Sequence, residues 1–193
     1  NKKEIIEEAL SGNLCRCTGY RPIIDAAKSL NNKKNKDHFE KNQNKAIQLL
    51  KKIKVIDIEI NHHGRKFFAP KTIPNLKKIL KKYPDAKILS GGTDLSLEVT
   101  KFRKDIKTIV SLNSINKLKF VKKNKNLIEI GATTSLFEFQ NLIKKYFIDF
   151  YEVLKRYGSI QIRNVGTIAG NIATASPIGD ALPLLLSLDA KIV

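Results

Sequence analysis

The stretch Ile88-Leu89-Ser90-Gly91-Gly92-Thr93-Asp94-Leu95 carries the clearest structural signal in the chain. Its apolar beginning predicts a strand, and the two glycines predict a turn in which successive backbone N–H groups face one side. Glycine tolerates positive φ and leaves the path of a ligand clear, so such a turn can bind phosphate or pyrophosphate oxygens. Most glycine-rich turns are nevertheless purely structural. Asp94 would repel a phosphate, so we expect it to cap the turn or to contact a sugar or hydroxyl group.

Strands and helices are both expected on either side of this turn, which gives an α+β fold class. Alternation and β-branched residues predict strands at residues 55–60, 67–70, 86–90, 108–112, 117–121 and 127–132, and from 191 onward. Helical spacing predicts helices at residues 74–83, 135–145, 149–157 and 181–188. Ser135 and Glu138 have the spacing of a capping box.

A second glycine-rich stretch covers residues 164–180. Gly166, Gly170 and their small neighbours would let another surface approach closely, and Thr167 and Asn171 add neutral polar groups. Asp180 precedes the helix expected at 181–188, where helix capping would account for it without any function. The stretch lacks the strand, GxGxxG turn and downstream acid of a Rossmann dinucleotide site, so that fold is not supported.

The N-terminal part is expected to form two helices, over residues 2–10 and 22–30, joined by a loop that contains Cys15-Arg16-Cys17. Two thiolates in such a loop can bind one metal, but zinc and each iron of a [2Fe–2S] cluster need four ligands. His38, His62 and His63 are expected to be exposed and non-ligating. Spacing alone leaves half a metal site and two ordinary small residues as equal interpretations.

Composition bounds the remaining possibilities. The 193 residues are 42% hydrophobic, which excludes a wholly disordered chain, and no apolar run approaches the roughly 18 residues of a membrane span. With neither a signal segment nor a disulfide framework, we expect a cytoplasmic protein that does not bind membranes. The absence of methionine predicts a chain that begins inside a longer reading frame.

A formal charge of +18 suggests a basic protein that binds nucleic acid or another polyanion as the non-enzymatic alternative. Only six of the 36 basic residues are arginine, and the lysines are scattered over stretches such as 33–36, 77–82 and 122–125. A nucleic-acid footprint more often gathers Arg and aromatic residues on one face. We therefore expect solvated lysine-rich surfaces and no nucleic-acid partner.

Taken together, the motifs resemble the molybdenum hydroxylases. Residues 12–23 resemble the second half of their all-helical [2Fe–2S] domain, 88–95 the pyrophosphate loop of their PCMH-type FAD domain, and 161–180 its second flavin-binding stretch. The resemblance implies three segments: residues 1–32 as the C-terminal part of the helical [2Fe–2S] domain, 33–52 as a linker, and 53–193 as the N-terminal part of the FAD-binding domain.

The resemblance also implies site residues. Cys15 and Cys17 would be two of the four ligands of a [2Fe–2S] cluster, with a Cys-x-x-Cys pair expected before residue 1. The residues expected to contact FAD are Ile88, Leu89, Ser90, Gly91, Gly92, Thr93, Asp94, Leu95, Tyr157, Thr167, Gly170, Asn171 and Asp180. No catalytic residue is expected in this chain.

Because the cysteine loop and the glycine turn share one chain, the resemblance favours the small subunits of the xanthine dehydrogenase type. It implies a hetero-oligomer in which electrons pass from a molybdenum cofactor on a large partner subunit through [2Fe–2S] clusters to FAD and then to NAD during oxidation of hypoxanthine or xanthine. Flavin subunits of the aldehyde oxidase or carbon monoxide dehydrogenase type remain the alternatives.

Overall fold

The computed structural model describes residues 2–17, 19–30, 37–176 and 179–193. The chain divides into two compact units, Asn1–Val55 and Ile56–Val193, which are described separately. Among the described residues, no helix combines the length and the apolar character needed to cross a bilayer. The residues outside these ranges include Thr18 of the cysteine loop and residues 31–36, which overlap the start of the expected linker. Pro177 and Ile178 of the second glycine-rich stretch also lie outside them.

Two helices of the first unit hold the cysteine loop, as predicted. Helix α1 (Lys2–Leu10) packs against α2 (Tyr20–Ser29), and Ile6 is the buried apolar residue of the pair. Helix α2 begins two residues before the predicted start at Pro22, because proline is tolerated anywhere in the first turn, where backbone N–H groups have no helical partner. Residues 11–17, including both cysteines, follow α1 without regular helix or strand.

The segment expected to be a linker over residues 33–52 contains a regular helix. Helix α3 (His38–Lys51) begins with a capping box, in which the Asp37 side chain accepts from the Glu40 amide and Glu40 reaches back to the Asp37 amide. This pairing supplies two of the hydrogen bonds that a helix start lacks. The Asp37-x-x-Glu40 spacing is that of a capping box, but the Lys- and Asn-rich composition of the segment favoured its interpretation as a linker.

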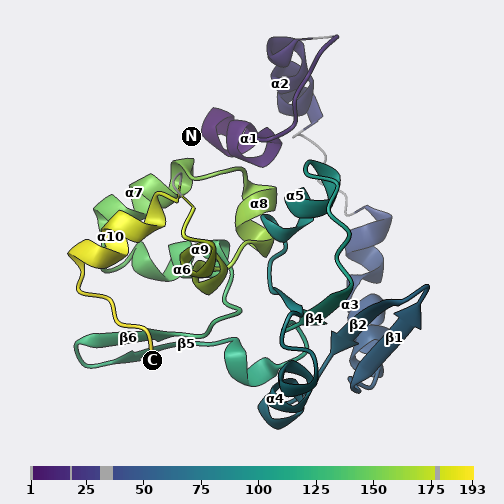
Figure 1. Cartoon of the computed structure of the whole chain (residues 1–193). Helices are drawn as coiled ribbons and strands as arrows, with labels where there is room; N and C mark the ends of the chain where they lie inside the picture. Colours follow the sequence, from purple (N-terminus) through teal and green to yellow (C-terminus); the bar gives the residue numbers. More distant parts are fainter. Residues whose placement is uncertain (1, 18, 31–36, 177–178) are drawn as a thin grey trace. The chain divides into compact units, whose positions relative to one another are not determined.

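A four-stranded mixed sheet opens the second unit (Figure 1). Its order is β1 (Ile58–His62), β2 (Arg65–Ala69), β4 (Thr108–Ser111) and β3 (Lys87–Leu89). Strands β1 and β2 are antiparallel, whereas β4 runs parallel to both β2 and β3. Helix α4 (Ile73–Lys82) connects β2 to β3, and the Thr72 side chain caps its first turn. The glycine turn directly follows β3, so it lies at the carboxyl end of a strand in the parallel part of the sheet.

Helices of the second half form the main apolar core. They are α6 (Leu136–Ile143), α7 (Ile148–Arg156), α8 (Ile160–Val165), α9 (Ile168–Thr174) and α10 (Ala181–Ser187). The core is built by the buried side chains of Leu136, Phe139, Ile143, Phe150, Leu154, Ile168 and Ala181. Phe139 and Phe150 meet edge to face with ring centres 5.4 Å apart. The predicted capping box of Ser135 and Glu138 is confirmed at the start of α6. The α+β class is therefore confirmed.

Two of the predicted strands are wrong, and three helices of the second unit were not predicted. The strand expected at 117–121 is a short 3-10 helix (Asn116–Leu118) followed by β5 (Val121–Asn124), which pairs with β6 (Leu127–Ile130). Pairing across a turn at Lys125 brings two solvent-facing lysines into β5, so tertiary pairing outweighs the local apolar pattern. Residues 191–193 form no strand, and α5 (Leu95–Thr100), α8 and α9 are helices that the sequence pattern did not indicate.

Candidate functional site

The glycine turn after β3 touches the backbone of the second glycine-rich stretch. An ideal Cβ on Gly91 would lie 2.2 Å from the Val165 carbonyl oxygen and 2.8 Å from Gly166 Cα. Real Cβ atoms do not come this close to a backbone, so only glycine fits at this position. Gly92 has a φ of +77°, the left-handed conformation that the turn was predicted to need. Two segments more than 70 residues apart in the sequence therefore lie side by side.

Backbone hydrogen bonds join the second glycine-rich stretch to the residues at the start of α6. The Leu136 amide donates to the Gly166 carbonyl at 2.8 Å, and the Ile168 amide donates to the Thr134 carbonyl at 3.3 Å. Ser135 and Thr167 form an isolated antiparallel bridge between these bonds. The start of α6 thus holds residues 166–168 against the glycine turn.

Tyr157 and Asn171 connect the end of α7 to the middle of α9. The Asn171 side-chain amide nitrogen donates to the Tyr157 hydroxyl at 2.8 Å. Burial raises the pKa of Tyr157 above its ordinary value, the Asn171 hydrogen bond opposes that rise, and the negative charges of Asp180 and Asp94 add to it. Three predicted FAD-contact residues, Asn171, Asp180 and Asp94, therefore act on the Tyr157 hydroxyl.

Asp94 and Asp180 are exposed acids at helix starts, and neither side chain caps its helix. Asp94 precedes α5 and Asp180 precedes α10, both with helical backbone angles. The prediction that helix capping accounts for Asp180 is therefore wrong, and Asp94 makes no side-chain cap hydrogen bond at the start of α5. Because a residue in the αR conformation is already part of the helix, its carboxylate does not face the first amides as a cap requires.

Two buried polar atoms in these segments have no hydrogen-bond partner among the described residues. They are the Ser90 hydroxyl oxygen, just before the glycine turn, and Asn171 Oδ1. A buried polar atom without a partner costs about 1–3 kcal/mol, so native proteins rarely leave one unless a ligand or water satisfies it. Both atoms belong to residues that the sequence assigned to FAD.

Other predicted contact residues have structural roles that the geometry explains directly. The Thr167 hydroxyl caps α9 by accepting from the Gly170 amide at 3.1 Å, and a Cβ on Gly170 would lie 2.7 Å from that hydroxyl. The Leu89 carbonyl accepts from the Leu112 amide at 2.8 Å. Ile88 lies half exposed in β3, and Leu95 is the first residue of α5.

Arg163 is an important residue that the sequence reasoning missed. Its side chain is almost fully buried, and one guanidinium nitrogen donates to the carbonyls of Lys155, Tyr157 and Gly158 at 3.2, 3.3 and 2.7 Å. Burial lowers the pKa of the guanidinium. The arginine thereby fixes the turn that carries Tyr157. An arginine within an otherwise apolar and small-residue stretch was the available signal.

The cysteine loop contains both cysteines of the sequence. Cys15 is half-buried, Cys17 is exposed, and neither forms a disulfide. The Cys15 amide donates to the Tyr20 hydroxyl at 3.4 Å. Across the described parts of the chain, no group of three or more His, Cys, Asp or Glu side chains could hold a metal ion. The sequence contains only two cysteines, so it provides at most half of the four thiolates of a [2Fe–2S] cluster.

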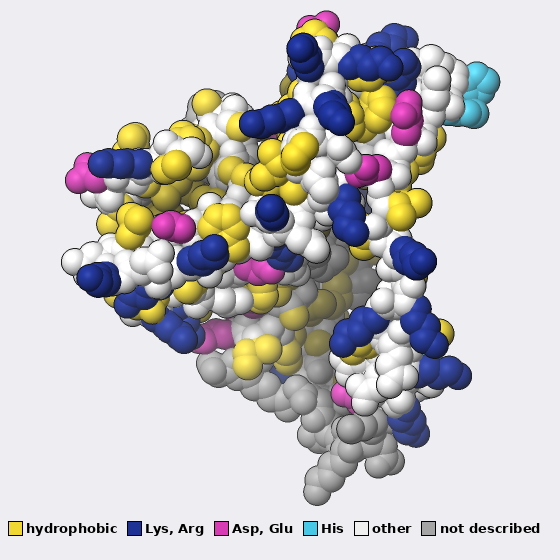
Figure 2. Space-filling view, turned by 90° about the horizontal axis from the view of Figure 1, so that it is seen from below, with side chains coloured by type: hydrophobic (Ala, Val, Ile, Leu, Met, Phe, Trp, Pro, Cys, Tyr) yellow, Lys and Arg dark blue, Asp and Glu magenta, His cyan; other side chains and the backbone are white. Residues whose placement is uncertain are grey.

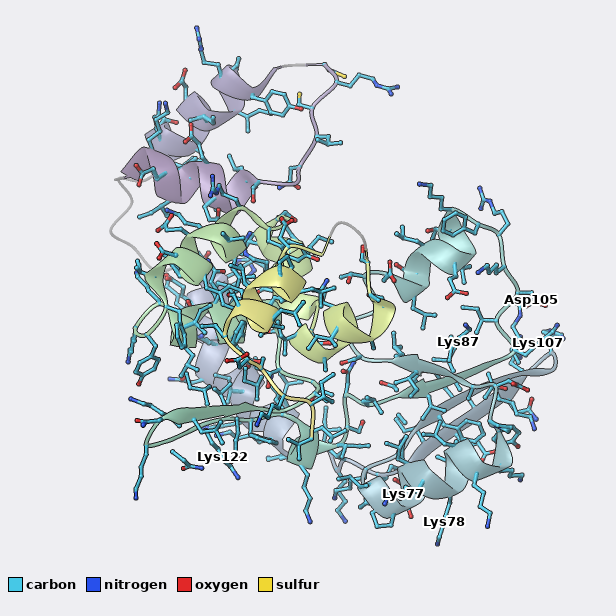
Figure 3. All side chains as sticks on the ribbon, turned by 60° about the vertical axis from the view of Figure 1, so that its left-hand side comes forward. Lys77, Lys78, Lys87, Asp105, Lys107 and Lys122 are labelled. Atoms are coloured by element: carbon cyan, nitrogen blue, oxygen red, sulfur yellow. The ribbon has the colours of Figure 1, made fainter. Side chains whose placement is uncertain are left out.

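The basic residues do not gather into one patch on the face shown in Figure 2, where Lys and Arg side chains lie among apolar and neutral ones. Figure 3 shows Lys77 and Lys78 on α4, Lys107 beside Asp105, and Lys122 on the β5–β6 hairpin, on separate elements of the second unit. Such dispersed lysines are typical of a solvated surface. Lys33, Lys34 and Lys36 lie outside the described residues.

The arrangement of the second unit has the chemical requirements for FAD. The glycine turn can offer backbone N–H groups to a diphosphate, whereas Asn171, Asp94 and Asp180 can accept hydrogen bonds from hydroxyl or N–H groups. Two surface hollows lie elsewhere, one between α1, α2 and their loop and the other beside the first turn of α4. The evidence for the candidate site is therefore the contact between the two glycine-rich segments and the buried polar atoms in them, and neither surface hollow contributes to it.

Comparison with known protein families defines the class. Residues 60–193 match the FAD binding domain in molybdopterin dehydrogenase, and residues 1–28 match a [2Fe–2S] binding domain. The chain therefore belongs to the molybdopterin dehydrogenase family of FAD-binding domains, preceded by a [2Fe–2S] binding domain of the molybdenum hydroxylases. The resemblance drawn from the three motifs is confirmed.

Individual relatives cover different parts of the chain. Xanthine dehydrogenase 1 of Arabidopsis thaliana is 30% identical over 98% of this chain, and the nicotinate dehydrogenase FAD-subunit of Eubacterium barkeri is 34% identical over 66% of it. The chain spans about a fifth of the first relative's length (19%) and 44% of the second.

Solved structures show the same fold. A Cu,Mo-CO dehydrogenase in its cyanide-inactivated form matches with a TM-score of 0.56 and 27% identity, covering 62% of this chain and 43% of that one. The carbon monoxide dehydrogenase of Hydrogenophaga pseudoflava matches with a TM-score of 0.55 and 26% identity, covering 61% of this chain and 42% of that chain.

Proposed function

We propose that the second unit binds FAD along the line where the glycine turn meets the second glycine-rich stretch. The carrying observation is the contact of Gly91 with the Val165–Gly166 backbone, flanked by the unpartnered buried oxygens of Ser90 and Asn171. In this proposal the residues from Ile88 to Leu95 line the diphosphate side. Tyr157, Thr167, Gly170, Asn171 and Asp180 line the other wall.

Cys15 and Cys17 are proposed as two ligands of a [2Fe–2S] cluster, completed by two thiolates that this sequence does not contain. The residues that fit FAD best are those of the second unit, and bound FAD would supply exchange between one-electron donors and a hydride acceptor. This chain's own residues would bind and orient that group and tune it electrostatically. None of them is proposed as an acid–base catalyst.

For the whole protein we propose an iron–sulfur and flavin electron-transfer subunit of the xanthine dehydrogenase type. Its electrons would come from a molybdenum cofactor on a partner subunit during oxidation of hypoxanthine or xanthine, and NAD would be the acceptor. The supporting observation is the coverage: a xanthine dehydrogenase aligns with 98% of this chain, including the cysteine loop, whereas the nicotinate dehydrogenase FAD-subunit aligns with 66%.

A flavin subunit of another molybdenum hydroxylase is the second candidate. The 34% identity to the nicotinate dehydrogenase FAD-subunit and the structural likeness to carbon monoxide dehydrogenases support it. The substrate class separates the two candidates. Isolation of the protein with its molybdenum partner, followed by assays with xanthine, nicotinate, aldehydes and carbon monoxide, would distinguish them through NAD-coupled turnover.

Titration of the purified chain with FAD tests the flavin proposal first. We expect saturable quenching or enhancement of flavin fluorescence at one site per chain, and much weaker binding of FMN, which lacks the diphosphate and the adenosine. Equal weak binding of both flavins, lost at about 0.15 M salt as for dispersed surface charge, would contradict the proposal. Tight, steeply salt-dependent binding of nucleic acid would instead support the polyanion alternative.

A further inference from the structure

Helix α3 presents apolar side chains that the described residues leave uncovered. It is a regular helix of 14 residues with a capping box at its start, yet none of its residues is buried. Its large apolar side chains, together with one that directly follows the helix, are exposed to the following extents: Phe39 73%, Ile47 41%, Leu49 56%, Leu50 64% and Ile53 66%. Exposed apolar side chains that gather on one side of an element mark an interaction surface.

Helical spacing brings these apolar side chains to one side of α3. Phe39, Ala46 and Leu50 are seven and four residues apart, so they lie along one line of the helix. Ile47 and Leu49 lie on either side of that line, so the apolar side spans about 160° of the helix circumference at 3.6 residues per turn. This arc is as wide as that of a helix that packs against a core.

Two side-chain amides inside the apolar arc indicate what kind of surface would cover it. Asn42 and Gln43 are both exposed, and the Asn42 amide nitrogen donates to the His38 carbonyl at 2.8 Å. Lipid acyl chains offer no hydrogen-bond partner to the remaining amide atoms, so their burial in a membrane would be costly. A protein surface can satisfy these amides and cover the apolar side chains at the same time.

The polar side of α3 is positively charged. Lys41, Lys45 and Lys52 are four and seven residues apart, so they form a row along one edge of the polar side. The only acid between residues 38 and 54 is Glu40, and its side chain closes the capping box. By charge complementarity, a surface that binds this helix has an acidic rim around an apolar centre.

The same charge argues against a second copy of this chain as the occupant. Two α3 helices packed face to face would each bring a row of lysines and a single acid, which like-charge repulsion disfavours. The chain as a whole has 36 basic and 18 acidic residues, so its own surface is a poor source of an acidic rim. A different, acidic protein surface fits the helix better.

We infer that α3 docks this chain on the molybdenum partner subunit, in a groove with an apolar floor and an acidic rim. This inference rests on the proposed function, which supplies that partner. The apolar side of the helix enters the groove, and the lysine row contacts its rim. Because α3 lies between the cysteine loop and the glycine turn in the sequence, docking at this helix attaches both motifs to the subunit from which the electrons are proposed to come.

A variant that changes only the apolar side of α3 tests the groove. Ile47→Gln combined with Leu50→Gln removes apolar surface at two exposed positions and introduces residues that are compatible with a helix. In calorimetric titrations of the full-length protein with the purified partner subunit, this double variant should lose about 30-fold or more in affinity. The thermal midpoint of the variant alone should equal that of the wild type.

A charge-reversal variant tests the acidic rim. Lys45→Glu combined with Lys52→Glu should lose about 10-fold in affinity at low salt and less at about 0.5 M salt, because exposed charges are screened. Lys77→Glu combined with Lys78→Glu is the matched control, since both lysines are exposed on α4 of the second unit (Figure 3). The control variant should stay within about 2-fold of the wild type.

Four results would overturn the inference while the wild-type protein still binds its partner. One is unchanged affinity of both α3 variants for the partner subunit. The others are a thermal midpoint lowered by the glutamine variant, loss of self-association, or loss of binding to vesicles of phosphatidylserine and phosphatidylcholine, each with partner affinity unchanged. These assign the apolar side to another part of this chain, a second copy or a lipid surface. Failure of the wild-type protein to bind the partner overturns the proposed partner itself, and that result depends on no variant.

Hydrogen exchange of the wild-type protein provides a second readout. Backbone amides of α3 should exchange about 10-fold or more slowly in the complex than in the free protein, because a docked helix opens less often. Amides of α4 should exchange at the same rate in both states. Equal exchange of α3 in the free protein and in the complex would contradict the inference.

Discussion

The cysteine loop and the glycine turn are two motifs of one chain that differ in how much of a site the described residues contain. The glycine turn packs against the backbone of a distant segment, and buried polar atoms without partners lie in both segments. The cysteine loop has one half-buried and one exposed thiol, and the sequence holds no further cysteine. A nucleotide site made of backbone and packing can be built within one unit, whereas a four-thiolate cluster depends on the number of its ligands.

Replacement of Gly91 by alanine should have the largest effect on FAD binding, because it disrupts the contact of Gly91 with the Val165–Gly166 backbone, on which the proposed flavin site depends. The new Cβ would lie 2.2 Å from the Val165 carbonyl oxygen, and a backbone atom cannot move aside cheaply. We expect FAD affinity to fall by about 100-fold or more, equivalent to about 2.7 kcal/mol, in fluorescence titrations.

Gly64→Ala is the matched control for that variant. Gly64 lies in the β1–β2 turn with a φ of +74° and has no atom within 4 Å of an added Cβ. Its replacement should cost about 1 kcal/mol of folding free energy from backbone strain and leave FAD affinity unchanged. Equal effects of G91A and G64A on FAD binding would contradict the proposal that FAD binding requires the close approach of Gly91 to the Val165–Gly166 backbone.

Replacement of Arg163 by alanine should cause the next largest effect. It removes a buried guanidinium that donates to three carbonyls and leaves those acceptors and a cavity behind. We expect a loss of about 2–4 kcal/mol in the free energy of unfolding, measured by urea denaturation. Arg163→Lys should recover part of the stability, because a lysine can reach fewer of the three carbonyls. A fully stable R163A would contradict this role.

The pKa of Tyr157 offers a smaller test of the acidic wall. Removal of the Asp180 charge in Asp180→Asn should lower the pKa of Tyr157, because that charge raises it. The folded state holds the phenolic proton more firmly than the unfolded state, so this contribution to stability is complete below the unfolded pKa of about 10 and is lost as pH rises through the folded pKa. The phenolate difference spectrum between each protein and its Y157F counterpart would report the change. An unaltered titration in D180N would separate Asp180 from the Tyr157–Asn171 pair.

The double variant Cys15→Ser, Cys17→Ser should have the smallest effect on flavin binding. The cysteines and the glycine turn belong to different compact units, so FAD affinity should stay within about 2-fold of the wild type, a difference of about 0.4 kcal/mol. A strong loss of FAD affinity in this variant would show that the two motifs depend on each other. The same fluorescence titration provides the comparison.

Local signals with a physical mechanism predicted much of this molecule. Pro74 and Pro84 bounded α4 well, the Ser135–Glu138 spacing gave the capping box, and the glycines near residues 91 and 166 indicated a close approach that the structure contains. The proline boundaries and the capping box depend on backbone geometry that neighbouring residues impose, so the sequence alone predicts them. The glycines predict that some close approach occurs, but only the structure shows that the partner of Gly91 is the Val165–Gly166 backbone.

Other features depended on tertiary contacts that no local pattern contains. Helices α8 and α9 are short, with six and seven residues, and backbone bonds between residues 134–136 and 166–168 hold the segment that joins them. The Tyr157–Asn171 bond and the Arg163 contacts join side chains to groups whose position follows from how α7, α8 and α9 are placed. The capping prediction for Asp180 was wrong because this residue has helical backbone angles and makes no side-chain cap hydrogen bond.

The most direct test of the flavin site is a crystal structure of this chain with FAD bound. We predict that the diphosphate lies at the backbone N–H groups of Gly91 to Thr93, and that the cofactor also contacts the 166–171 segment. Density for FAD that touches neither the glycine turn nor the 166–171 segment would contradict the central claim.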